Sequence, residues 1–457
     1  MNSTSGPTDL DSAARLLERA ERLRDLLRGQ ARRAFVLEFT GTPKAGKSTS
    51  VEVLKAFFKQ AGYHVHLLKE RAADCPLPMK GHFFFNAWTT ATMLAEVLET
   101  YETNVDLLIL DRGFFDALIW LELQDRRAQV TRQEKEVFAN FVLLDRWRSL
   151  VDCTVVMKVE PLKALERERS TQIVERTGSM MNERSLAEFN EALADASQQY
   201  GSRFSLIEID TTQASGSIKT CTDLLSDLLP MMESWADPQI AVVPIDDVKQ
   251  IFADRHFIHE NDVEDALNQV ATNISLRRRS DAENDPSLVQ FVAAGVLVHD
   301  ERFLILERER RDRKADYGRT KLWIGCHVET DVSASAAKLI CTAKDCLGRR
   351  IQQELHLATP ITPALVGLAW ERDRPQHLGM MFKLPVPNQY VADHLEEKHF
   401  KKMGRSGRLT SRFQTRVKII TTLAQQKDLL DLEPWSEYFI NNVGPVHPEP
   451  SKESSES

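Results

Sequence analysis

Residues 41–48, GTPKAGKS, decide the fold of the first half of the chain. They match the pattern G-x-x-x-x-G-K-[ST], in which the glycines let successive backbone N–H groups face one anion. The apolar run AFVLEF (34–39) precedes the motif, and a helical pattern follows it to about Gln60. This is the strand–turn–helix context that the motif requires, and the start of the helix adds a positive dipole end. The segment is therefore expected to bind the phosphates of a nucleotide.

The chemistry of each position in this loop follows from the spacing. Lys47 is predicted to neutralise the charge of the β- and γ-phosphates, and the Ser48 hydroxyl to bind Mg²⁺, so ATP and Mg²⁺ are the expected cofactors. A tight glycine turn with a chance lysine is the alternative. The residues expected to contact the nucleotide are Gly41, Thr42, Pro43, Lys44, Ala45, Gly46, Lys47, Ser48 and Thr49.

The rest of the first half alternates between strand and helix patterns. Further strands are predicted at 63–68, 106–110, 153–159 and 204–209. Helical stretches between them favour a parallel sheet with helices on both faces. The third strand ends in LLILDRG, so Asp111 is expected at the carboxyl edge of the sheet, where it could hold Mg²⁺ or accept a proton. Arg112 could reach a substrate phosphate or sugar there. A strand-end salt bridge is the alternative for this pair.

Composition sets aside several classes of protein. The chain has 457 residues, 42% of them hydrophobic, and a formal net charge of −8, which argues against a nucleic-acid partner. No apolar run is long enough to span a membrane, and the N-terminal residues lack the pattern of a signal peptide. Six scattered cysteines without a CxxC pair favour a reducing compartment, which we expect to be the cytoplasm.

Changes of pattern divide the chain into a P-loop α/β domain and a later α+β domain. A helix over 11–28 is expected to pack its leucine stripe on its own domain rather than on a partner subunit. The polar run LRRRSDAENDPS (276–287) is interpreted as part of an interdomain linker. The expected divisions are an N-terminal tail and helix (1–32), the first domain (33–235), a linker region (236–288), the second domain with C-terminal helices (289–440) and a disordered tail (441–457).

Residues 33–212 resemble the thymidylate-kinase and deoxynucleoside-kinase group of P-loop kinases. The resemblance rests on GTPKAGKST, on Glu70-Arg71 after the second strand and on DRG after the third. It implies that Glu70, Arg71, Asp111 and Arg112 meet the phosphate acceptor, with Glu70 as candidate general base or sugar ligand. The segment ERERSTQIVERTG resembles the arginine-bearing lid of the group, which would carry Arg167, Arg169 and Arg176. A solvated, charge-alternating helix explains the same letters.

The chain departs from both groups at the acceptor motifs. After its second and third strands it carries Glu70-Arg71 and Asp111-Arg112-Gly113, in place of the REPGGT and DRY of thymidylate kinases or the EP and ERS of deoxynucleoside kinases. The acceptor therefore stays open. An aromatic cluster could line its pocket or belong to the core: Phe83, Phe84, Phe85, Asn86 and Trp88.

Residues 289–386 resemble the Nudix fold, on LWIGCHVET and a later helix reading GRRIQQELHL. The Nudix box holds Mg²⁺ with helical glutamates. Here Gly325 takes the first glycine position, Asp331 stands for the first glutamate, and Arg350 and Gln353 replace two helical glutamates. Glu354 keeps its place. We therefore expect a binding or structural relative of Nudix hydrolases. Two alternatives remain: Glu329, Asp331 and Glu354 could hold one ion, or Arg349 and Arg350 could bind a nucleotide phosphate.

Together these patterns predict a kinase for a nucleoside, a nucleoside monophosphate or a similar metabolite, with an appended Nudix-like domain. An ATP-gated regulator is the main alternative, and a polynucleotide end-processing enzyme is a third. The sequence also leaves a homo-oligomer open. The expected catalytic residues are Lys47, Glu70, Asp111, Arg112 and Arg169, and the expected metal ligands are Ser48, Asp111 and Glu354.

Overall fold

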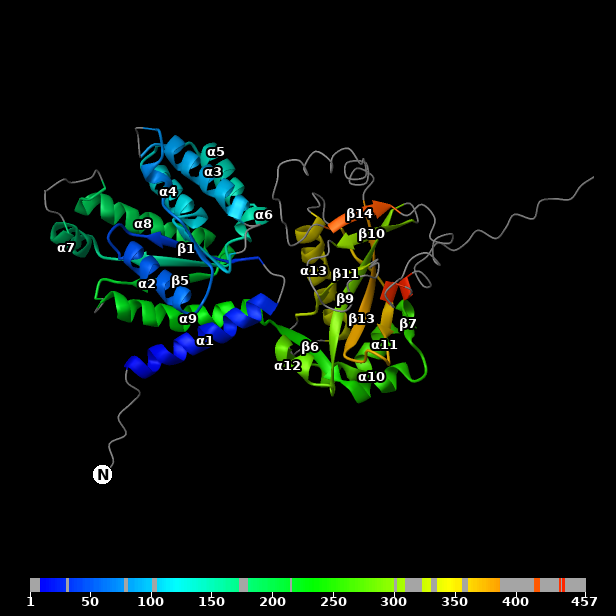
Figure 1. Ribbon diagram of the computed structural model, residues 1–457. Coiled ribbons are helices and arrows are strands. Elements are labelled where there is room, and N and C mark those ends of the chain that lie inside the picture. Colours follow the sequence, from blue (N-terminus) through cyan, green and yellow to red (C-terminus); the bar gives the residue numbers. More distant parts are fainter. Residues whose placement is uncertain are drawn as a thin grey trace, which may run out of the picture. The chain divides into compact units, whose positions relative to one another are not determined.

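The chain forms two compact units, Met1–Ala236 and Asp237–Ser457, each with its own sheet (Figure 1). None of the helices in the described ranges is long and apolar enough to cross a membrane. The computed structural model describes residues 9–29, 33–77, 81–100, 105–171, 180–213, 216–299, 302–308, 323–329, 335–355, 361–386, 415–419, 435–436 and 438–439.

The first unit is built on a parallel sheet of five strands in the order β2-β3-β1-β4-β5. The central strand β1 pairs with β3 on one side and β4 on the other, and all seven of its residues are buried. A strand covered on both faces has to be largely apolar, which is what the run AFVLEF indicated. The predicted α/β fold is confirmed. The strands are β1 (Phe35–Gly41), β2 (Val65–Leu68), β3 (Leu107–Asp111), β4 (Cys153–Lys158) and β5 (Leu206–Asp210).

Helices cover both faces of this sheet (Figure 1). Alternate side chains of β1 enter two separate cores: Phe35, Leu37 and Phe39 pack with α1, α2 and α9, whereas Val36 packs with α3, α4, α5 and α8. The helices are α1 (Asp9–Gly29), α2 (Lys47–Gln60), α3 (Phe83–Thr100), α4 (Phe114–Arg126), α5 (Arg132–Val142), α6 (Asp145–Arg148), α7 (Pro161–Thr171), α8 (Glu183–Tyr200) and α9 (Ser217–Ala236), with 3₁₀ turns η1 (Arg71–Ala73) and η2 (Gly201–Arg203).

The N-terminal helix α1 is part of the first unit. Its leucine stripe is buried in the same core as α2 and α9, and α1 runs beside α9 (Figure 1). Leu23 is 1% exposed, and the Arg19 guanidinium pairs with the Glu233 carboxylate of α9. The stripe therefore packs on its own unit, as its narrow width suggested.

The second unit is a mixed sheet around the long strand β9. β13 runs parallel to β9, whereas β6, β10 and β11 pair with it in the antiparallel sense. Helix α13 packs on this sheet through apolar residues that include Leu339 and Leu347. The strands are β6 (Gln239–Pro244), β7 (Phe257–His259), β8 (Ser275–Arg278), β9 (Leu288–His299), β10 (Arg302–Arg308), β11 (Trp323–His327), β12 (Ala364–Trp370), β13 (His377–Pro385) and β14 (Thr415–Ile419). The helices are α10 (Ile245–Phe252), α11 (Glu260–Val270), α12 (Arg279–Asn284) and α13 (Ala336–Leu355), with the 3₁₀ turn η3 (Ala271–Asn273).

The linker expected over 236–288 is instead folded into this unit. It supplies β6, α10, β7, α11, β8 and α12, and β6 pairs with both β8 and β9. Within the polar run, Ala282 is fully buried against Ile240 and Val242 of β6. The Asp237 carboxylate accepts hydrogen bonds from the Ser280 backbone N–H (2.8 Å) and hydroxyl (2.6 Å). Backbone pairing and the small buried Ala282 thus join the polar run to β6, whereas α10 and α11 pack on the sheet through apolar residues such as Phe252 and Leu267. The expected tail, 441–457, lies outside the described residues.

The substitution Leu23→Ala should lower the free energy of unfolding of the first unit by about 2–5 kcal/mol, because it leaves a cavity between α1 and α9. Chemical denaturation followed by circular dichroism measures the change. Glu18→Ala on the same helix is the matched control. Its pairing with Arg22 is exposed, so it should change stability by less than about 0.5 kcal/mol. Equal effects of the two substitutions would show that α1 contributes no core.

Candidate functional site

The loop between β1 and α2 has the backbone geometry of a phosphate-binding loop. Gly41 has φ +125°, and a Cβ there would lie 2.0 Å from the Met157 carbonyl oxygen of β4. Gly46 caps α2 in the left-handed region, with φ 99°. Both positions therefore require glycine. The loop is fastened to β4 by the Thr42 N–H, which donates to the Met157 carbonyl at 2.9 Å.

Lys47 at the start of α2 is buried and points back into the loop. Its ammonium donates to the carbonyls of Gly41 and Thr42, each at 2.8 Å. Burial lowers the pKa of Lys47 to about 7, with a further contribution from the Arg112 guanidinium, and the carboxylates of Asp116, Asp111 and Glu70 oppose the shift. The ammonium therefore occupies a place where an added phosphate would strongly favour its charged form.

The carboxyl ends of β2 and β3 bring the predicted acid–arginine residues together. Arg112 pairs with the Glu70 carboxylate at 2.8 Å. Burial alone lowers the pKa of Arg112, but Asp116, Glu70 and Asp111 together raise it above its usual value. Burial raises the pKa of Asp111, against the opposing effects of Arg112 and Lys47. Parallel neighbouring strands end at the same edge, so residues distant in sequence meet there.

Two polar residues of this group were missed by the sequence analysis. The Asp116 carboxylate, on the first turn of α4, accepts from the Arg112 guanidinium at 3.0 Å and from the Thr40 hydroxyl at 2.5 Å. The i, i+4 spacing of Arg112 and Asp116 was a usable signal. Thr40 offered none, because its partner lies 76 positions along the chain.

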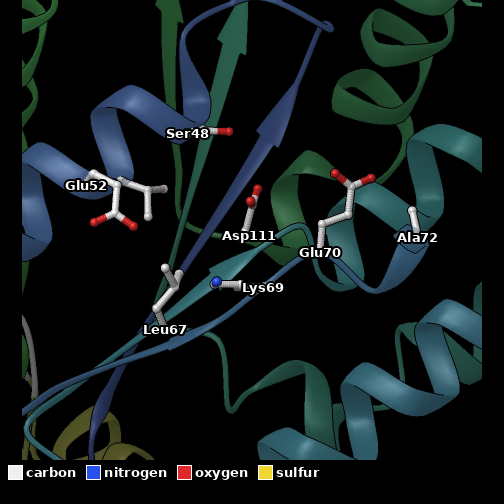
Figure 2. Close-up of a pocket in the computed structure, with 8 residues that line it drawn as sticks. Ser48, Glu52, Leu67, Lys69, Glu70, Ala72 and Asp111 are labelled. Carbon is white, nitrogen blue, oxygen red and sulfur yellow. The ribbon is translucent and has the colours of Figure 1, made fainter. Parts of the chain in front are cut away.

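A pocket of about 450 Å³ opens between the phosphate loop and this group. Figure 2 shows Ser48 on α2 and Asp111 at the end of β3, with Glu70 beside Asp111. The Ser48 hydroxyl and the two carboxylates are oxygen donors of the kind that Mg²⁺ prefers. The lining residues are Ser48, Val51, Glu52, Leu67, Lys69, Glu70, Ala72 and Asp111.

Helix α7, where the lid was expected, is joined to the phosphate loop. The Arg167 guanidinium donates to the Lys44 carbonyl at 3.1 Å and to the Thr211 carbonyl at 2.5 Å, and Lys44 pairs with Glu168 at 2.5 Å. Arg169 is exposed on the same helix. Arg176 lies outside the described residues.

A further contact from α8 to the loop had no sequence signal. The Thr42 hydroxyl donates to the Asn190 side-chain carbonyl at 2.6 Å, and the Asn190 amide donates to the Val159 carbonyl at 3.0 Å. Asn190 therefore ties the loop to the chain that follows β4.

The aromatic cluster expected near the acceptor is divided between the core and the surface. Phe83 packs against Phe138, with ring centroids 5.3 Å apart, and Phe84 is 65% exposed. Asn86 is buried and donates to the Ala117 carbonyl at 3.0 Å. None of the cluster lines the described pocket. Arg71, next to Glu70, pairs with Asp74 at 3.0 Å and with Glu96.

Only some of the residues expected to form a metal site in the second unit lie among the described residues. Gly325 lies in β11 and Glu354 in the last turn of α13, but Asp331 lies outside the described residues and the Glu354 side chain is not described. Arg349 is exposed, and its guanidinium donates to the Cys346 Sγ at 3.3 Å. Among the described residues, no group of three or more His, Cys, Asp or Glu could hold a metal ion. Metal binding through Glu354 therefore stays a prediction.

The family described as methylmalonyl Co-A mutase-associated GTPase MeaB matches residues 10–81. The match spans α1, the phosphate loop and β2, which is a small part of the chain. No curated protein matches the chain.

Several solved structures are similar to parts of the chain. Deoxyadenosine kinase from M. mycoides with bound dATP is 20% identical over 43% of this chain and 99% of its own, with a TM-score of 0.34. Thymidylate kinase from Candida albicans is 12% identical over 43% of this chain and 91% of its own, with a TM-score of 0.31. Tm1382, provisionally described as a Nudix hydrolase, is 23% identical over 32% of this chain and 75% of its own, with a TM-score of 0.25. None of these values is high enough to assign an activity.

Binding of Mg²⁺–ATP near pH 8 should take up protons, up to about one per site, because the pKa of Lys47 is about 7 and a neighbouring triphosphate raises it. Titration calorimetry in buffers of different ionisation enthalpy measures this uptake. Lys47→Arg keeps the charge at all pH values used, so it should bind with less proton uptake than the natural protein. Equal uptake by the two proteins would mean that Lys47 is already charged in the nucleotide-free protein.

Proposed function

We propose that the first unit is an ATP-dependent phosphotransferase that acts on a nucleoside, a nucleoside monophosphate or a similar small metabolite. The observation that carries this proposal is the pocket of about 450 Å³ between Ser48 and the carboxylates of Glu70 and Asp111. Hydrolysis needs room for one water beside the terminal phosphate. A pocket of this volume leaves room for a second substrate.

The donor nucleotide would be held by the phosphate loop, residues 41–49. Main-chain N–H groups and the Lys47 ammonium would contact the phosphates. Ser48 and Asp111 would hold Mg²⁺, since both offer hard oxygen donors to the same pocket. When bound, the ion would offset charge on the phosphate oxygens. Arg112 and the exposed Arg169 would stabilise charge that develops during transfer.

The acceptor would be oriented by the two carboxylates. Its hydroxyl oxygen attacks the γ-phosphorus, the bond to the bridging oxygen of ADP breaks, and ADP leaves with the electron pair of that bond. The hydroxyl proton passes to Asp111 or Glu70. Glu70 is favoured as the proton acceptor, because a Mg²⁺ ion held by Asp111 would lower the proton affinity of that carboxylate, and Glu70 lines the same pocket.

GTP hydrolysis coupled to regulation is the second candidate function. It is favoured by the match to a GTPase family, which spans the phosphate loop. In that case nucleotide occupancy would gate contact between the two units, and turnover would be slow and independent of an acceptor.

Purified protein with Mg²⁺ and labelled ATP or GTP should release ADP or GDP when the right nucleoside or nucleotide acceptor is added. Lys47→Ala should reduce this release at least about 100-fold, because it removes a charge that stabilises the transferred phosphoryl group. Lys59→Ala, exposed at the end of α2, is the matched control and should keep full activity. Tight binding without acceptor-dependent release would instead indicate the regulator.

The same assay separates the roles of the two carboxylates. Asp111→Asn removes a metal ligand, so it should raise the Mg²⁺ concentration needed for half-maximal activity, whereas Glu70→Gln removes the proton acceptor and should reduce kcat at saturating Mg²⁺. A larger loss of kcat at saturating Mg²⁺ with Asp111→Asn would instead move the role of general base to Asp111.

For the second unit we propose nucleotide binding without standard Nudix hydrolysis, since Arg350 and Gln353 stand where the resemblance implies metal carboxylates. A panel of nucleoside diphosphate derivatives with Mg²⁺ should therefore show no pyrophosphate cleavage above that of buffer, in parallel with an active Nudix hydrolase. Cleavage that chelation of the metal abolishes would contradict this proposal and restore Glu354 as a metal ligand.

We also infer a reducing, cytoplasmic setting. All six cysteines are free, including the exposed Cys341 and the partly exposed Cys75. The proposed partner is a small-molecule substrate, with no membrane and no nucleic acid involved, and a homo-oligomer stays open.

A further inference from the structure

Glu38 is a carboxylate at the centre of the sheet of the first unit. It lies in the middle of β1, between Leu110 of β3 and Thr154 of β4, and it has no exposed surface. Burying a carboxylate in an otherwise apolar strand is costly unless its oxygens are satisfied. The hydrogen bonds that the Glu38 carboxylate accepts therefore explain how a charged group can be buried in this strand.

The Glu38 carboxylate caps helix α4 from another element. It accepts hydrogen bonds from the backbone N–H groups of Phe115 (3.2 Å) and Asp116 (3.0 Å), in the first turn of α4. The residue at the N-cap of this helix is Gly113, which offers no side-chain cap. Glu38 thus satisfies donors that the helix leaves open, and its charge faces the positive end of the helix dipole.

The turn before α4 is packed directly on this carboxylate. A Cβ at Gly113 would lie 2.9 Å from the Glu38 carboxyl carbon and 3.1 Å from each of its oxygens. A side chain at position 113 would have to displace the Glu38 carboxylate from this contact. The position of the turn is therefore set by the Glu38 side chain as well as by the backbone.

This turn carries Arg112 and Asp116, which together with Glu70 form the ion-paired side of the candidate site. Arg112, immediately before Gly113, adopts φ +69°, a conformation that a non-glycine residue keeps only when its surroundings hold it. Asp116, whose N–H bonds to Glu38, accepts from Arg112 at 3.0 Å, and Arg112 pairs with Glu70 at 2.8 Å. A continuous chain of contacts thus runs from Glu38 to the pocket.

The charge of Glu38 is sensitive to pH near neutrality. Burial raises the pKa of Glu38 to about 7, and its bonds from the α4 amides only partly oppose the shift. The charged group that acts on it is the Asp116 carboxylate of α4, and its neighbours in the sheet are the uncharged Leu110 of β3 and Thr154 of β4. Because the folded-state pKa lies above that of an ordinary glutamate, the stability that protonated Glu38 contributes is complete below about pH 4.5 and is lost as the pH rises through about 7.

We propose that Glu38 is a positioning residue: its ionised carboxylate holds the first turn of α4, and through it Asp116 and Arg112, where Glu70 and Asp111 meet the acceptor. This inference rests on the proposed phosphotransfer. Proteins commonly keep a residue that lowers the stability of the fold when that residue is needed for function, and a buried ionised Glu38 fits this pattern. Glu38 touches neither substrate, and its effect is exerted through the turn.

The test is Glu38→Gln, which keeps the shape of the side chain and removes its charge. At saturating Mg²⁺–ATP and pH 8, kcat should fall by about 10-fold or more, because a mispositioned charge weakens transition-state stabilisation. KM for ATP should change little, since the phosphate loop is untouched. The melting temperature at pH 8 should stay equal or rise. Glu122→Gln, a buried carboxylate near the other end of α4, is the matched control and should leave kcat unchanged.

The pH profile adds a readout that a purely structural role would not move. The natural protein should lose kcat as the pH falls through about 7, when Glu38 becomes protonated, and Glu38→Gln should lack this limb. An unchanged kcat in Glu38→Gln, or a limb near pH 7 that persists in it, would overturn the proposal.

Hydrogen exchange separates this test from the proposed function. In Glu38→Gln the amides of 112–117 should exchange faster, whereas those of α2 should not. If the natural protein releases no ADP or GDP in response to any acceptor, the proposed phosphotransfer is wrong. Unchanged exchange of the amides 112–117 in Glu38→Gln would show, independently of that result, that Glu38 does not hold the turn in place.

Discussion

The buried ammonium of Lys47 is the interaction on which the candidate site depends. An ammonium taken out of water is costly unless other groups satisfy it. Here the carbonyls of Gly41 and Thr42 accept its hydrogen bonds, at 2.8 Å each. Those carbonyls face it because the loop turns sharply at Gly41, whose backbone lies against Met157 of β4. The lysine, the glycine and the neighbouring strand therefore form one arrangement, in which a change to any member disturbs the others.

The opposite side of the pocket is organised by a second buried cation. Arg112 lies between Glu70, after β2, and Asp116, on α4, so its charge joins two elements that are not adjacent in sequence. The Glu38 carboxylate holds the same turn by accepting hydrogen bonds from the backbone N–H groups of Phe115 and Asp116. The two cations and their carboxylates balance one another at the edge of the sheet. Burial lowers the pKa of Lys47 and raises that of Asp111, but each of these groups also has oppositely charged neighbours that favour its charged form.

In the second unit, a polar segment forms a strand of the sheet. β8 (Ser275–Arg278) overlaps the polar run 276–287, yet it pairs with the buried strand β6, which in turn pairs with β9. Main-chain hydrogen bonds do not depend on side-chain polarity, and one face of an antiparallel pair can remain polar. The unit consequently begins at Asp237, about fifty residues before the first strand that its hydrophobic pattern indicated.

The sequence by itself determined the parallel sheet, the phosphate loop and the identity of Lys47, Ser48, Asp111 and Arg112 as residues at one edge. These follow from short windows: a buried strand, two glycines at fixed spacing and an acid at a strand end. Only the tertiary structure decided that Arg112 is shared by Glu70 and Asp116, that Glu38 caps α4, and that the supposed linker is part of a sheet. The reason is physical: such contacts depend on the order of strands in space, and a local pattern records how a segment folds but not which segment becomes its neighbour.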